Sequence, residues 1–223
     1  MGSISFWMCL ILTICTWNKT IGCTWMRTLP RSPSMFQVLS NSTITMLQKM
    51  GHVVSRKSQI TFPNEQYRQV DNFTDNGRIV FISQTLNAIE KLYSSGKYDS
   101  TAWDQKVVDE FMIGLHRQTS ELDQCVKTIK PGLSTSVKRV NKDMSLHFKF
   151  LKNYLKREVG QFVLPREYIH QVGIYSYVLT QHVSILKYDM CVSFMQEYSA
   201  SGWEDIRNVV MSHMLRLVTI PID

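Results

Sequence analysis

Histidines are the side chains of this sequence best suited to acid–base catalysis or metal binding. No HExxH motif or Cys/His cluster relates the six that occur, which are His52, His116, His147, His170, His182 and His213. The glycines form neither a GxGxxG nor a GxxxxGK phosphate-binding pattern, and adjacent carboxylates such as Asp109 and Glu110 are typical of a solvated helix face. We therefore predict a binding protein, not an enzyme, with no metal and no cofactor.

The cysteines could form disulfides if the chain is secreted. Residues 1–22 have the pattern of a secretory leader. The apolar run Phe6–Trp17 is followed at Thr20–Gly22 by side chains that signal peptidase accepts before its cleavage site. This run is shorter than the about 20 apolar residues that a membrane-spanning helix needs. We expect cleavage before Cys23 and no stable membrane insertion. The mature secreted domain, 23–223, would then carry Cys23, Cys125 and Cys191 into an oxidising compartment.

The charge of the chain favours acidic partners. Its formal net charge is +7, which suits acidic receptors, glycosaminoglycans or membranes but selects none of them. We expect no nucleic-acid partner, because the sequence has no long basic run and no RNA-binding aromatic motif. Two sequons, at Asn41 and Asn72, predict glycosylated surface positions.

Apolar residues recur at helical spacing through most of the chain, which predicts an all-α bundle of five main helices. Gly51 is expected to end the first helix in a left-handed conformation, and Thr101–Asp104 and Ser201–Glu204 have the spacing of capping boxes that begin later helices. Residues 52–76 are expected to be irregular. The predicted helices span about Met35–Met50, Gly77–Tyr93, Thr101 to Pro131, Ser136–Arg157 and Ser201–Leu217.

The helical spacing also predicts which side chains are buried. The first helix should bury a stripe of Leu39, Thr43, Met46 and Met50. His147 falls on the apolar stripe of its helix, so we interpret it as a core or boundary histidine and not as a ligand.

Several motifs, taken in order, resemble type I interferons of teleost fish. Residues 198–207 are similar to the family's YSxxxWExxR signature, with Trp203, Glu204 and Arg207 at the defining positions. We interpret Trp203 as a core residue. Further elements match as Leu122–Val126 to LxxCV, Phe62–Glu65 to FPxE, and Cys23–Trp25 to the mature start of fish members, together with Leu47–Gly51 and His116–Gln118.

The resemblance implies one disulfide. Four-cysteine interferons carry a second bridge at positions that correspond to Val53 and Ser201, so this chain fits the two-cysteine group with Cys23 paired to Cys125. Closing so long a loop would contribute about 4–5 kcal/mol in the chain-entropy model.

The resemblance also implies a function. Members of the family bridge two class II helical cytokine receptor chains and induce antiviral genes through JAK-STAT signalling, and we expect a monomeric ligand. One receptor is expected to bind the first long loop and the last helix, and the other the opposite face of the second to fourth helices. The implied receptor contacts are Arg56 and Lys57 in the loop and Arg207, Asn208, Met211 and Ser212 on the last helix.

Residues 159–196 fit neither the family nor the rest of the chain. Joining Glu158 directly to Glu197 restores the family's short connection, and the odd cysteine, Cys191, lies inside the segment. Valine and glutamine codons at its ends can supply the GT and AG of an intron, so we hypothesise a retained intron. A genuine lineage-specific loop or extra helix is the alternative. The uncharged run Ile174–Leu179 favours a strand or aggregation.

Two other functions stay open at this level. Another secreted helical cytokine would share the leader and the bundle but use different receptors. A secreted cationic helical protein that acts on lipid or membranes is suggested by the basic helix at 136–157.

Overall fold

The computed structural model describes residues 23–27, 32–51, 60–94, 98, 101–129, 132–160 and 182–222, and of residues 157–160 and 182–199 it describes only the backbone. The regular elements within these ranges are six α-helices, as the hydrophobic spacing predicts for an all-α chain. They are α2 (Met35–Met50), α3 (Asn64–Val70), α4 (Asp75–Ser94), α5 (Gln105–Thr128), α6 (Thr135–Gly160) and α8 (His182–Val218).

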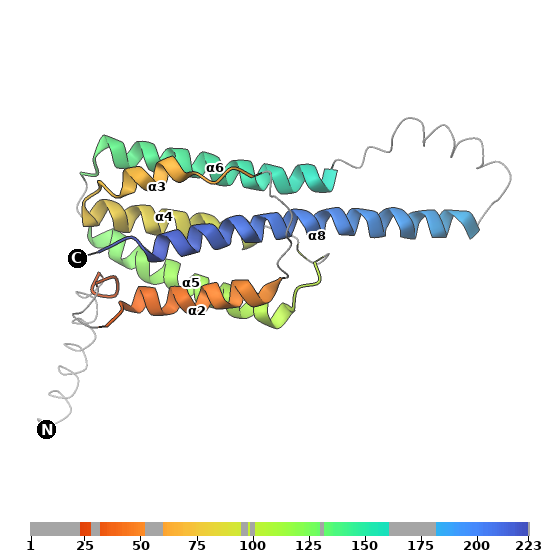
Figure 1. The fold of residues 1–223 in the computed structure, drawn as a ribbon, viewed down its shortest axis with the longest axis horizontal. Helices are drawn as coiled ribbons and strands as arrows, with labels where there is room; N and C mark the ends of the chain where they lie inside the picture. The colour runs from red at the N-terminus through yellow and green to blue at the C-terminus, as the bar shows by residue number, and fades with distance from the viewer. Residues whose placement is uncertain are drawn as a thin grey trace, which may run out of the picture.

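The long helices lie side by side as a bundle around one apolar core (Figure 1). Helix α2 packs against α5 and α8, α4 packs against α5 and α6, and α6 also packs against α8. The short helix α3 lies on α6 and α4. Segments far apart in sequence therefore meet on α8, which contacts the first and the fourth of the predicted helices.

The predicted first helix is confirmed at both ends. Ser34 forms a capping box with Gln37: its hydroxyl accepts from the Gln37 N–H at 3.2 Å, and the Gln37 side chain accepts from the Ser34 N–H at 3.0 Å. The left-handed ending at Gly51 is wrong, since Gly51 has φ −138° and ψ 175°, an extended conformation.

The predicted stripe of α2 is shifted. Its buried residues are Phe36, Ser40, Thr43, Ile44, Leu47 and Met50, whereas Leu39 and Met46 are half-buried. The reason is that α2 contacts α5 on one side and α8 on the other. Polar residues can be buried on the α5 side because Gln118 of α5 accepts from the Ser40 hydroxyl at 2.7 Å and donates to Thr43 Oγ1 at 2.8 Å.

The predicted start of the third helix is wrong, and one short helix was not predicted. Helix α5 begins after Asp104, whose carboxylate accepts from the Lys106 N–H at 2.9 Å, while the Thr101 hydroxyl donates to the Tyr98 carbonyl instead of capping. Helix α3 interrupts the expected irregular stretch. It has only seven residues, too few for an amphipathic repeat to be evident.

Helix α8 begins at His182, not at Ser201. Ser201–Glu204 therefore lie inside a continuous helix and do not cap a helix start, although their residue types and spacing match a capping box. Part of the atypical segment, 182–196, forms the first part of α8. This helix extends beyond the ends of the other described helices (Figure 1). The strand-favouring run 174–179 lies outside the described residues.

The expected disulfide is present between Cys23 and Cys125, with a Cα–Cα distance of 4.9 Å. It joins the start of the described chain to the last turn of α5. Just after Cys23, the Trp25 carbonyl accepts from the Phe36 N–H at 3.2 Å, and the two rings pack edge to face with centroids 5.9 Å apart. The N-terminal segment is thereby fixed to α2 as well as to α5.

Candidate functional site

An aromatic cluster surrounds Trp203 where α8 meets α4 and the residues before α5. Trp203 is 2% exposed, which agrees with its interpretation as a core residue. Its ring lies 5.5 Å from Tyr93, 5.8 Å from Tyr98 and 5.9 Å from Trp103 between centroids. The edge-on and tilted arrangements are those that aromatic quadrupoles favour. This cluster fixes the register of α8 on the bundle.

A buried ion pair lies next to the aromatic cluster. Arg207 is 3% exposed, and its Nε donates to Glu204 at 2.7 Å. Its Nη1 donates to the Leu47 carbonyl at 3.2 Å, near the end of α2. Trp103 Nε1 donates to the other Glu204 oxygen at 2.6 Å. We call these four residues the arginine network; it joins α2, α8 and the residues that precede α5.

Gly51 lets the arginine network reach the end of α2. A Cβ at this position would overlap the Glu204 carboxylate and the Arg207 guanidinium. The glycine in the Leu47–Gly51 motif is thus required by a close approach to α8, not by a special backbone dihedral.

The outer face of α8 carries a separate stripe of residues one turn apart. Asn208 and Met211 are half-buried, Ser212 is exposed, and Leu215 is 48% exposed. The spacing of three, four and seven residues places them on one side of the helix. The Ser212 hydroxyl donates back to the Asn208 carbonyl at 3.1 Å. We call these four residues the α8 stripe.

A second buried polar cluster lies further along α8, where α3 and α6 meet it. His213 is fully buried, with its Nδ1 2.7 Å from the Tyr67 hydroxyl and its Nε2 3.1 Å from His147 Nε2. The Phe62 and Phe148 rings lie 4.8 and 5.0 Å from the His213 ring between centroids. We call Tyr67, His147 and His213 the histidine chain.

Burial keeps the histidine chain neutral. Desolvation lowers the pKa of His147 to about 4, in keeping with its prediction as a boundary residue. Desolvation, and then repulsion from His147 whenever that ring is protonated, hold the pKa of His213 well below its ordinary value. Burial raises the pKa of the Tyr67 hydroxyl well above its ordinary value, with Arg216 opposing this effect. Since an Nε2 faces an Nε2, one histidine donates and the other accepts.

The structure separates the sequence-predicted contact residues. Asn208, Met211 and Ser212 lie together on the outer face of α8, whereas Arg207 is 3% exposed and points into the bundle. Arg56 and Lys57 lie outside the described residues. Sequence reasoning missed Leu215, although an apolar residue seven positions after Asn208 is a signal that could have identified it.

The predicted glycosylation positions are on the surface. Asn41 is exposed on α2, and Asn72 is exposed in the turn between α3 and α4. Within the described ranges, no group of three or more His, Cys, Asp or Glu residues could hold a metal ion. Among the helices that the structure describes, none is both long enough and apolar enough to cross a membrane.

The described residues form a helical bundle with one disulfide and an exposed stripe on its last helix, an architecture that helical cytokines share. Residues 33–159 match the family described as Interferon alpha/beta domain, and this match ends where the atypical segment begins. The chain therefore belongs to the interferon alpha/beta family. Membership assigns it to the cytokines, which act by binding cytokine receptors and are not enzymes.

Individual relatives agree with this assignment. Interferon a3 of Oncorhynchus mykiss is 24% identical over 220 residues, which cover 97% of this chain and 95% of the relative. Interferon alpha-3 of Equus caballus is 26% identical over 129 residues, 55% of this chain and 65% of the relative. The solved structure of zebrafish interferon 1 matches with a TM-score of 0.60 and 24% identity, over 83% of this chain and 93% of that one, and supports the fold.

Proposed function

We propose that this chain is a secreted type I interferon-like cytokine that binds two class II cytokine receptor chains and induces antiviral genes through JAK-STAT signalling. The α8 stripe is the observation that supports a contact surface on the last helix. It presents the apolar side chains of Met211 and Leu215 beside the polar Asn208 and Ser212, and apolar anchors with a polar border are typical of protein interfaces.

Arg207 has a different role in this proposal. Because its guanidinium is held by Glu204 and the Leu47 carbonyl, it positions α8 against α2 and does not contact a receptor. Arg56 and Lys57 remain proposed contacts of the first long loop. We infer that the loop and the α8 stripe act together on one receptor chain, while the α4–α6 side binds the other.

Substitution of the α8 stripe tests the receptor assignment. We expect Met211→Asp with Leu215→Asp to abolish binding to one receptor ectodomain, because a carboxylate buried in an apolar interface has no partner there. Binding to the second ectodomain should be unchanged, which serves as the internal control for folding. Antiviral reporter induction in receptor-bearing fish cells should fall in parallel. Equal loss of both receptors, or no loss of either, would contradict the assignment.

The atypical segment 159–196 requires a separate test. Reporter induction by the full secreted chain would be compared with induction by a variant that lacks this segment. The retained-intron hypothesis predicts activity in the shortened form only and a messenger RNA that lacks the segment. Equal activity, with the segment present in the messenger RNA, would make it a tolerated loop.

Secretion and glycosylation can be tested together. We propose that Asn41 and Asn72 both carry N-linked glycans after removal of residues 1–22. Chain recovered from the medium of expressing cells should begin at Cys23. Treatment with an N-glycosidase should lower its mass in two steps. Asn41→Gln should remove one of these steps and Asn72→Gln the other.

A further inference from the structure

Positive charge is concentrated on one helix of the bundle. Between Thr135 and Lys156, α6 carries six basic residues and one acidic residue, Asp143. Charge on α5 is nearly balanced, with Lys106, Arg117 and Lys127 against Asp109, Glu110, Glu121 and Asp123. The six cations of α6 are all exposed: Lys138, Arg139, Lys142, Lys149, Lys152 and Lys156.

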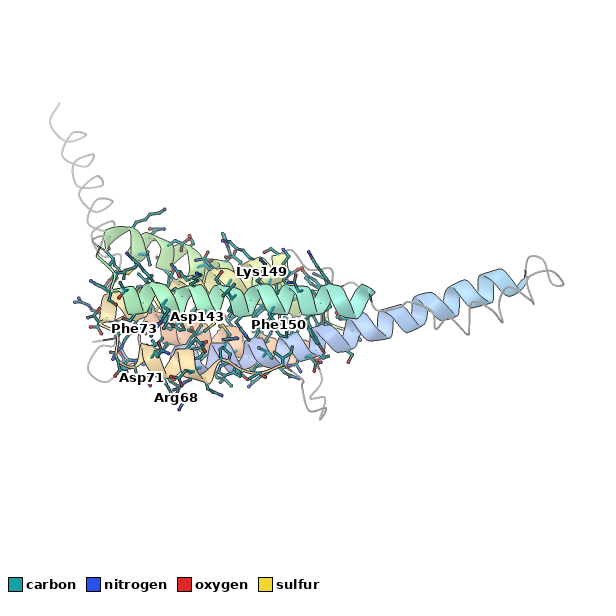
Figure 2. All side chains as sticks on the ribbon, turned by 90° about the horizontal axis from the view of Figure 1, so that it is seen from above. Arg68, Asp71, Phe73, Asp143, Lys149 and Phe150 are labelled. Carbon is teal, nitrogen blue, oxygen red and sulfur yellow. A yellow bond between two sulfur atoms is a disulfide. The ribbon has the colours of Figure 1, made fainter. Side chains whose placement is uncertain are left out.

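Four of these lysines form a line. At 100° per residue, Lys138, Lys142, Lys149 and Lys156 fall within an arc of about 40°, and a rise of 1.5 Å per residue spreads them over about 27 Å. Figure 2 shows Lys149 and Phe150 at adjacent positions along α6. We call the four residues the lysine line.

The lysine line has no carboxylate partner among the side chains that the structure describes. None of these carboxylates lies within 4.0 Å of its ammonium groups, whereas arginines elsewhere pair with Glu65, Asp75 and Glu204. Arg139, beside the line, donates to the Gln69 side chain at 3.1 Å. Uncompensated like charges in a row are a cost to the folded chain, and a polyanion relieves it.

We propose that the lysine line binds a sulfated glycosaminoglycan chain. A linear polyanion matches four cations arranged along about 27 Å of a straight helix, and lysine ammonium groups suit sulfates as point charges. A lipid surface fits less well, because the large exposed apolar side chains of this face are limited to Leu146 and Phe150, at 54% and 47% exposure, and both lie on one border of the line.

Heparin binding by the full chain, at increasing NaCl concentrations, tests the proposal. Replacing Lys142, Lys149 and Lys156 with Gln should weaken heparin binding about 100-fold. Each cation next to a polyanion is expected to raise the affinity by about fivefold, and three such factors multiply. The wild-type affinity should fall steeply with salt. The matched control is the α5 variant Lys106→Gln with Arg117→Gln and Lys127→Gln, which removes the same charge and should weaken binding less than about threefold.

Several outcomes would overturn the proposal. Equal losses in the α6 and α5 variants would show that binding follows net charge alone. Absence of heparin binding, or binding that does not respond to salt, would exclude the site. Adsorption to vesicles of phosphatidylcholine with phosphatidylserine that Leu146→Ser with Phe150→Ser abolishes, without heparin binding, would assign the face to lipid. No receptor is present in these assays, so their result is independent of the proposed signalling function.

Discussion

Two buried polar clusters hold α8 in place, and they do so by different physical means. The arginine network pairs two full charges, with Arg207 and Glu204 2.7 Å apart and the remaining Glu204 oxygen bound by Trp103. The histidine chain contains no charge, because burial lowers the pKa values of His147 and His213. In the first cluster, removing one member of the pair therefore takes away the counter-ion of the other. In the second cluster, adding a proton creates a charge that has no counter-ion.

The largest expected effect is on the arginine network. We expect Arg207→Met to lower the free energy of unfolding by about 3 kcal/mol, because Glu204, whose side chain is only 16% exposed, would keep a carboxylate without its counter-ion. Chemical denaturation at neutral pH measures this loss. The double variant Arg207→Met with Glu204→Gln is the control and should recover part of the stability, since the introduced amide can still accept from Trp103 without carrying a charge. If the single and double variants are equally unstable, the charge is not the cause.

The next effect is a loss of stability in acid through the histidine chain. The pKa of His147 is about 4 in the folded chain and about 6.5 when unfolded, so the unfolded chain binds the proton first as the pH falls. Stability should be greatest above about pH 6.5 and decrease toward about pH 4, by at most about 3 kcal/mol because one edge of His147 meets solvent.

Melting temperatures between pH 7.5 and pH 4 measure this slope. His213→Gln keeps an acceptor for the Tyr67 hydroxyl but cannot titrate, so its slope should be shallower than that of the wild type. His116→Gln is the matched control, since the His116 side chain is 74% exposed and lies outside the histidine chain. An unchanged slope in His213→Gln would show that His213 does not contribute to the acid response.

A smaller effect is expected at the other end of the histidine chain. Tyr67→Phe removes the hydroxyl that lies 2.7 Å from His213 Nδ1 and leaves that nitrogen unpaired. The free energy of unfolding should fall by about 1–3 kcal/mol. Tyr154→Phe is the comparison, because the Tyr154 hydroxyl donates to Asp205 at the half-exposed α6–α8 contact, where water can replace it. Denaturation should show the larger loss in Tyr67→Phe.

The smallest effect is expected for Trp103→Phe. The variant loses the 2.6 Å hydrogen bond to Glu204 but retains an aromatic ring beside Tyr93 and Trp203. Since Arg207 still compensates Glu204, a loss of about 1 kcal/mol is expected in the same denaturation assay. A loss as large as that of Arg207→Met would show that Trp103, and not the ion pair, dominates the arginine network.

Local sequence patterns predicted most of the helices because amphipathic spacing depends only on neighbouring residues. The ends of α2 and the core position of Trp203 were predicted on this basis and from the resemblance, as was the Cys23–Cys125 bridge. Helix α3 was missed because seven residues contain too little of the repeat. The start of α8 was placed at Ser201 because a capping-box spacing does not distinguish a helix end from a helix interior.

The amino-acid sequence by itself determined the fold class through its periodicity and the interferon family through its ordered motifs, and the resemblance to that family implied the disulfide. Only the tertiary structure decided that Arg207 is buried, that Gly51 accommodates it, and that Leu215 extends the α8 stripe. A motif records which residue type occurs at a position, but the packing of α2 against α8 sets the direction in which its side chain points. The motif therefore predicted an arginine on the last helix. Its role in positioning that helix depends on the hydrogen bond from Arg207 to the Leu47 carbonyl, which joins residues 160 positions apart.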